Sequence, residues 1–244
     1  MLKGLLPIFV GFICIFAMGC GKDSPWREAG AAQTIERSLQ GFHSIEIGQK
    51  FKLLLIQDST QSPNVVIDYF ENLNPNISTT ITDSVLSIKD QNTFQWTRDL
   101  NILPTVTVNV SSLKNLTISG ACEVICVDTI FGKQMTIQYS SVKHSQFRVD
   151  CGNLYGSSNN TGSIYFEGRG TIFAWSCEKG AWFDARNLRC DDAYIQHYTK
   201  QSLWVYPTKV AEFNIFNTGD IHYKDFGLLK KNFHQYGSGQ AIAD

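Results

Sequence analysis

Two short acidic segments carry the residue type that cleaves glycosidic bonds. They are the pair Asp191-Asp192 and the run Asn217-Thr218-Gly219-Asp220. Inverting glycosidases use two carboxyl groups, about 6.5–9.5 Å apart, as general acid and general base. Residues on neighbouring turns of a stacked β fold can reach such a separation. Asp191, Asp192 and Asp220 are therefore the candidate catalytic residues of a polysaccharide-active enzyme.

The order of these segments argues against that chemistry. In polygalacturonases an Asn-Thr-Asp segment comes first, a paired Asp next and a Gly-His-Gly later. Here the paired Asp comes first, Gly219 interrupts the Asn-Thr-Asp, and no Gly-His-Gly occurs. Because Asn and Asp also form turns, a turn role for both segments is favoured, and no catalytic residue is predicted.

The cysteines and histidines show no metal-ligand spacing. Five cysteines follow residue 20, namely Cys122, Cys126, Cys151, Cys177 and Cys190. An odd number leaves at least one thiol unpaired, and the Cys122-x-x-x-Cys126 spacing differs from that of a zinc or redox CxxC motif. Packing in the core is favoured for them, with disulfides as the alternative and their pairing open. The histidines are scattered as His43, His144, His197, His222 and His234. Neither a metal nor another cofactor is predicted.

Cys20 carries chemistry of another kind. Lys3 precedes an apolar run from Leu5 to Met18, which is shorter than the ~20 residues that span a bilayer. Small residues then lead into Cys20, as in a bacterial lipobox, where the thiol is acylated. We expect residues 1–19 to be a lipoprotein signal peptide, Cys20 to be the lipidation site, and residues 20–35 to be a polar tether. The alternative is an ordinary secretory leader.

Composition limits the remaining classes of function. The chain has 244 residues and a formal net charge of −1. Nearly balanced charge argues against nucleic acid as a partner, because such binding depends on neutralising phosphates. The expected partner is a membrane, reached through the lipid anchor, at an outer-membrane location in the cell envelope.

Residues 36–244 read as one β domain. Helical periodicity is nearly absent, and short alternating or β-branched runs are separated by Gly, Asn, Asp and Ser. In the N-terminal β region, residues 36–114, the expected strands are Ser44–Ile47, Phe51–Ile56, Val65–Tyr69, Ile77–Ile81, Val85–Ile88 and Thr105–Val110. A hairpin turn is expected at Asp83-Ser84.

Residues 115–244 repeat. A strand, a small or polar corner and an apolar residue recur about every 20 residues, as in a β-solenoid whose turns stack on one another. The recurring apolar positions are Val124, Phe147, Ile164, Trp182, Trp204, Ile221 and Ala241. The aromatic residues Phe173, Trp175, Trp182 and Trp204 are expected in the core, with surface positions as the alternative.

The chain resembles the family of auto-transporter adhesin head GIN domains of bacterial envelope lipoproteins. The likeness begins in Glu36 to Ile47, continues through Glu71–Ile77, Leu86–Ile88 and Leu116–Gly120, and ends in Tyr236–Ala241. Most corners lack the family's Ser-Gly-Ser-Gly repeat. The resemblance implies a right-handed parallel β-helix-like solenoid without known catalytic residues.

These observations predict a non-enzymatic envelope lipoprotein with an adhesin-like solenoid that binds a protein or a glycan along one elongated face. The alternatives are a polysaccharide-active β-helix enzyme and a purely structural envelope protein.

Overall fold

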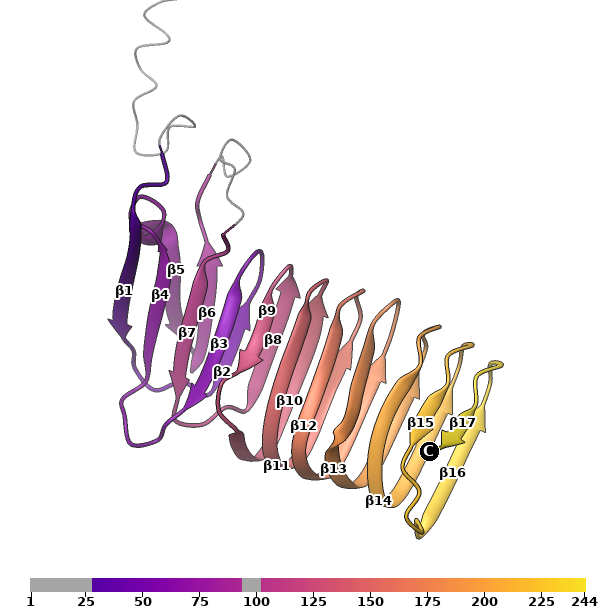
Figure 1. Cartoon of the computed structure of the whole chain (residues 1–244). Coiled ribbons are helices and arrows are strands. Elements are labelled where there is room, and N and C mark those ends of the chain that lie inside the picture. Colours follow the sequence, from indigo (N-terminus) through magenta and orange to yellow (C-terminus); the bar gives the residue numbers. More distant parts are fainter. Residues whose placement is uncertain (1–27, 94–101) are drawn as a thin grey trace, which may run out of the picture.

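The computed structural model describes residues 28–93 and 102–244. They form 17 strands of one continuous sheet, which coils into a β-solenoid (Figure 1). The strands of the N-terminal part are β1 Ala32–Ser38, β2 Ser44–Ile47, β3 Lys52–Gln57, β4 Asn64–Phe70, β5 Ile77–Thr82, β6 Val85–Asp90 and β7 Thr105–Val110. A short 3-10 turn, η1 Asn74–Asn76, precedes β5.

Longer strands follow. They are β8 Asn115–Gly120, β9 Glu123–Cys126, β10 Ile130–Ser141, β11 His144–Ser158, β12 Ser163–Cys177, β13 Trp182–His197, β14 Leu203–Ile215, β15 Ile221–Tyr223, β16 Lys230–Gln235 and β17 Ala241–Ala243. All pairings among β8 to β17 are parallel. The predicted all-β fold class, a parallel solenoid with a mixed N-terminal β region, is confirmed.

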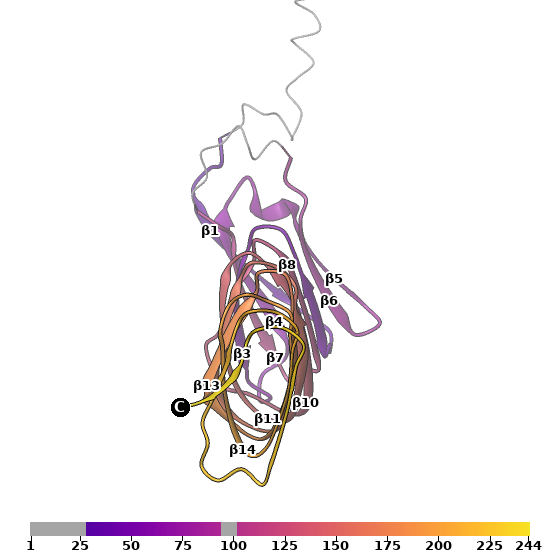
Figure 2. The same ribbon diagram turned by 90° about the vertical axis from the view of Figure 1, so that its right-hand side faces the viewer.

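The coils are flattened and have two long sides, as the end-on view shows (Figure 2). One side, here called side A, consists of β6, β2, β8, the second halves of β10 to β14, and β16. The other, side B, consists of β7, β3, β9, the first halves of β11 to β14, and then β15 and β17. Parallel strands stacked about 4.8 Å apart satisfy one another's backbone groups along both sides.

The stack begins before residue 115. Strand β2 pairs in parallel with β8, and β3 pairs in parallel with β9, so the N-terminal β region contributes coils of the same solenoid. Antiparallel strands β1 and β4 then cover its N-terminal end (Figure 1). Residues Ala32–Ile35, which we expected in the tether, belong to β1, because they pair with Ile67–Phe70 of β4.

Local sequence explains the turns. Asp83 and Ser84 both have positive φ, +51° and +62°, and join β5 to β6 as the expected hairpin. This two-residue geometry matches the twist of the flanking strands. Gly168 lies inside β12 at φ +118°, and a Cβ there would sit 1.9 Å from the Val149 carbonyl oxygen, so the position accepts only glycine without strain.

The core fills the space between sides A and B. Its centre is an aromatic cluster in which Phe166 contacts Phe147, Phe173, Trp175 and Phe183, with ring centroids 5.0–6.2 Å apart. Phe173 and Trp175 are buried, as predicted. Of the other two residues expected in the core, Trp182 is half-buried and packs against the core, so that prediction is right only in part. Trp204 is half-buried with its ring stacked on His222, contrary to the core prediction.

The predicted column of apolar residues is right at four positions and shifted at three. Val124, Ile164, Ile221 and Ala241 do occupy one column. In that column the structure has Ser145, Phe183 and Leu203 in place of the predicted Phe147, Trp182 and Trp204. Phe147 is still buried because it lies two residues further on, whereas a shift of one residue turns the tryptophans to the outer face.

Candidate ligand-binding face

The structure keeps the candidate catalytic acids apart. Asp191 lies at the bend in the middle of β13, where the register with β14 is irregular. Asp220 lies in the turn between β14 and β15, at the other end of the coil. Asp192 continues β13 in register with Ile172 and Val210. The two acidic segments therefore do not come together at one site.

Two of these acids, Asp191 and Asp220, also have a structural partner. The Oδ2 atom of Asp191 lies 2.8 Å from Lys209 Nζ, and this hydrogen bond holds the pKa of Asp191 below its ordinary value. The Asp220 carboxylate accepts a hydrogen bond of 2.8 Å from the backbone N–H of Gln240, which joins two successive turns. The turn interpretation is confirmed for Asp220 but wrong for Asp191-Asp192, which lie within strand β13.

The five cysteines are buried and free. Burial raises the pKa of Cys122, Cys126, Cys177 and Cys190 to about 12 and that of Cys151 to about 11. Such thiols stay protonated and chemically inert at neutral pH. The prediction that they pack in the core is confirmed.

Two further sequence features concern metals and the membrane. Within residues 28–93 and 102–244, no three Cys, His, Asp or Glu side chains gather as a metal site would require. No helix in this part of the chain is long and apolar enough to span a bilayer. Cys20, the predicted lipidation site, lies outside the described residues.

Side A presents its outward side chains as straight columns, because parallel strands in register place equivalent residues side by side. We call two of these columns together the polar ladder. The central column is Ser87, Glu46, Thr117, Gln138, Ser157, Ser176, Gln196, Asn214 and His234. The neighbouring column is Asn115, Thr136, Tyr155, Ala174, Tyr194, Glu212 and Asn232.

Hydroxyl and amide groups dominate the polar ladder. From Thr117 to Asn214 the central column is uncharged over six successive strands. The side chains of Gln138, Ser157 and Asn214 make no hydrogen bond to any described residue. Their donors and acceptors are therefore available to a ligand.

A hollow of about 450 Å³ lies in the polar ladder over β11 to β14. Tyr155 and Tyr194 stand on either side of Ala174, whose short side chain leaves the space between them. The polar residues that also line it are Ser176, Gln196, Asn214 and Glu212. Aromatic rings beside hydroxyls, amides and one carboxylate are the groups that contact sugars in open sites.

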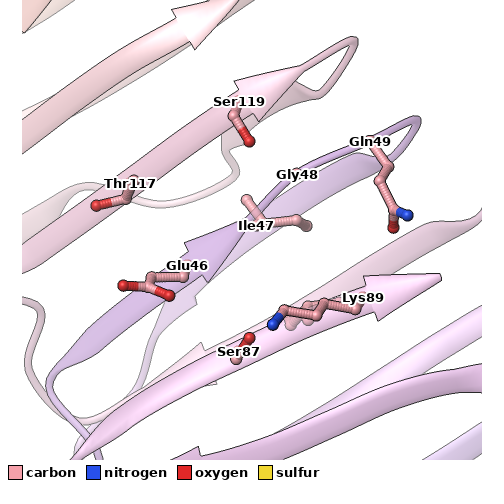
Figure 3. A pocket seen from close by; sticks show the side chains of 9 residues that line it. Glu46, Ile47, Gly48, Gln49, Ser87, Lys89, Thr117 and Ser119 are labelled. Atoms are coloured by element: carbon pink, nitrogen blue, oxygen red, sulfur yellow. The ribbon is translucent and has the colours of Figure 1, made fainter. Parts of the chain in front are cut away.

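A second hollow, also of about 450 Å³, lies at the N-terminal end of side A, over β6, β2 and β8 (Figure 3). Glu46 and Lys89 carry opposite charges on two of its strands, and Thr117 lies on the third. Gly48 leaves the hollow open, since a Cβ there would lie 2.6 Å from Ser119 Oγ. The buried Ser87 hydroxyl has no hydrogen-bond partner among the described residues.

Side B differs from side A because its polar groups pair with one another. Arg148 and Glu167 form an ion pair at 2.5 Å, and Arg186 and Asp184 form another at 2.9 Å. The Arg186 guanidinium also lies 4.9 Å from the centre of the Trp204 ring. Such internally paired groups are less available to a ligand than the side chains of the polar ladder.

Sequence reasoning did not single out Tyr155 or Tyr194. A usable signal is present in the sequence. The two tyrosines are separated by about two repeat lengths, and each directly follows a residue that is buried in the structure, Leu154 or Ala193. Reading it requires the register of the coils, which depends on the turns between them.

Fold and surface together define the class: a parallel β-solenoid whose exposed side A is a ladder of hydroxyl and amide groups. Residues 41–225 match the family model described as "Putative auto-transporter adhesin, head GIN domain". The chain belongs to this family, as its sequence resemblance indicated. The description favours a location in the cell envelope or at the cell surface.

Solved structures show the same fold. A putative adhesin from Bacteroides fragilis is 16% identical, with a TM-score of 0.81 over 88% of this chain and 97% of its own. A putative adhesin from Parabacteroides merdae is 17% identical, with a TM-score of 0.66 over 87% and 97%. A protein from Parabacteroides distasonis named as a putative lipid binding protein is 17% identical, with a TM-score of 0.63 over 87% and 97%. The search of curated proteins found no match.

Proposed function

We propose that the protein is a non-enzymatic, lipid-anchored protein of the cell envelope that binds a glycan through the polar ladder. The observation that carries the proposal is the run of uncharged hydroxyl and amide side chains over six strands of side A. Glycans present hydroxyl groups that both donate and accept hydrogen bonds, and such side chains match both roles.

The separation of Asp191 from Asp220 supports binding over hydrolysis, because glycosidic cleavage needs two carboxyl groups within about 10 Å of one another. Ion pairing occupies Asp191, and a backbone contact occupies Asp220. The family's adhesin description agrees with a binding role.

Replacing Ser157 by arginine tests the binding face. The full chain, purified in detergent, is applied to an immobilised envelope extract that contains both polysaccharides and proteins. We expect Ser157→Arg to abolish binding, because a long cation obstructs the middle of the ladder. The matched control is Gln146→Arg, which places the same side chain on the same strand but on side B, and should bind like the wild type.

The same assay determines whether the ligand is a glycan or a protein. Binding that periodate oxidation of the extract destroys supports a glycan. Binding that survives periodate but is lost after protease treatment of the extract would identify a protein ligand and contradict the proposal, as would equal loss in both arginine variants.

The lipid anchor is tested at Cys20. We expect the wild-type chain to sediment with membranes and to carry the added mass of acyl chains, since several chains together hold a protein at a bilayer. Cys20→Ser should lose both the added mass and the tight membrane association. Cys14→Ser, inside the apolar run, is the control and should retain them. A wild-type chain without acyl mass would refute the anchor.

A further inference from the structure

The spacing of Tyr155 and Tyr194 across their hollow limits the size of the ligand group that fits between them. These tyrosines lie in one column, two coils apart, with Ala174 between them. At the spacing of stacked strands, their attachment points are about 10 Å apart. One sugar ring fits over Ala174 with a tyrosine at each end.

The direction of a bound chain follows from the spacing of the polar groups. Along the solenoid axis, equivalent side chains recur about every 4.8 Å, whereas along a strand they recur only about every 6.6 Å. In an extended β-1,4-linked glycan each sugar advances the chain by nearly one strand spacing. Successive sugars therefore meet equivalent hydroxyl and amide groups only when the glycan runs along the axis.

The charged side chains near the polar ladder favour neutral glycans over acidic ones. The carboxylates of Glu46 and Glu212 lie toward the two ends of the uncharged run, and Glu212 also lines the Tyr155–Tyr194 hollow. The cation nearest to Glu212 is Lys230, 3.8 Å away, which leaves no excess positive charge there. A chain of uronic acids would meet repulsion, and a neutral chain would not.

From these observations we infer that the polar ladder binds a linear, neutral, β-1,4-linked glycan lying along the solenoid axis, with one sugar per coil and with Tyr155 and Tyr194 as its two aromatic contacts. This inference rests on the proposed function and specifies its ligand class.

The test is titration calorimetry of the full chain in detergent with three series of oligosaccharides, of two to six sugars each. The series are β-1,4-linked glucose, mannose and N-acetylglucosamine. In at least one series, affinity should rise with each added sugar up to about six. Six is the number of successive uncharged side chains in the central column, one on each strand.

The aromatic contacts are tested in that series. Tyr155→Ala and Tyr194→Ala should each weaken binding about tenfold, the effect of losing one good aromatic contact. Tyr194→Phe keeps the ring and should weaken binding less than Tyr194→Ala. The control is Tyr165→Ala, an exposed tyrosine on side B, which should leave the affinity unchanged.

Each outcome separates the inference from the proposed function. If envelope polysaccharides bind but none of the three series does, the inference fails and the glycan-binding function stands. The same holds if affinity does not depend on chain length, if the tyrosine variants bind normally, or if a β-1,4-linked uronic acid oligomer binds more tightly than the neutral chains. If neither polysaccharides nor oligosaccharides bind, the proposed function itself fails.

Discussion

Replacing Phe166 by alanine is expected to lower the free energy of unfolding by about 3–5 kcal/mol, the usual cost of removing a buried aromatic side chain. Phe166 is 2% exposed and lies at the centre of the core cluster, with its ring 5.0 Å from Trp175 and 5.4 Å from Phe173. The cavity would lie in the middle of the stack, where each coil relies on the coils next to it.

Guanidinium chloride unfolding, followed by circular dichroism and by tryptophan fluorescence, measures this effect. Phe166→Leu should cost clearly less, because most of the volume remains. Tyr165→Ala changes the neighbouring, outward residue and should shift stability by less than about 1 kcal/mol. A Phe166→Ala protein as stable as the wild type would show that these coils do not form one cooperative core.

The second large effect is a loss of stability in acid, caused by His197. Its side chain is fully buried, and neither ring nitrogen makes a well-formed hydrogen bond to a described residue. Burial lowers the pKa of His197 from 6.5 to about 4, and the backbone of Gly219 and Gln201, which favours the charged form, offsets this only in part.

The lowered pKa sets the direction and the pH range of the effect. Between pH 6.5 and 4 the unfolded chain binds a proton at His197 and the folded chain does not, so acid favours unfolding. The contribution is fully present above pH 6.5 and is lost as the pH falls to about 4. The expected loss in the free energy of unfolding is about 3 kcal/mol.

Unfolding curves measured from pH 4 to pH 7.5 test the assignment. Carboxylates also titrate in part of this range, so the informative quantity is the difference between wild type and His197→Leu, whose pH dependence should be shallower by that amount. Phe213→Leu, a core change in the next coil, should lower stability equally at every pH. Parallel curves for wild type and His197→Leu would exclude His197 as the source.

Much of the architecture could be predicted because it depends on short-range patterns. Alternation in Thr105–Val110 and the hairpin at Asp83-Ser84 are local, and both are observed. The recurrence of corners about every 20 residues reflects the length of one coil. Burial of the free cysteines also follows from their type and surroundings.

The sequence by itself determined the β class, the stacking of coils, the family, and the turn role of Asp220, because periodicity and turn chemistry involve neighbouring residues. Only the tertiary structure decided which residues share a column. The spacing of equivalent positions differs from coil to coil, with 21 residues from Val124 to Ser145 but 19 from Ser145 to Ile164, so an approximate repeat misplaces the tryptophans at 182 and 204 by one residue. The same long-range register brings Tyr155 level with Tyr194 and keeps Asp191 away from Asp220, since coil-to-coil alignment depends on the length of every intervening turn and bulge.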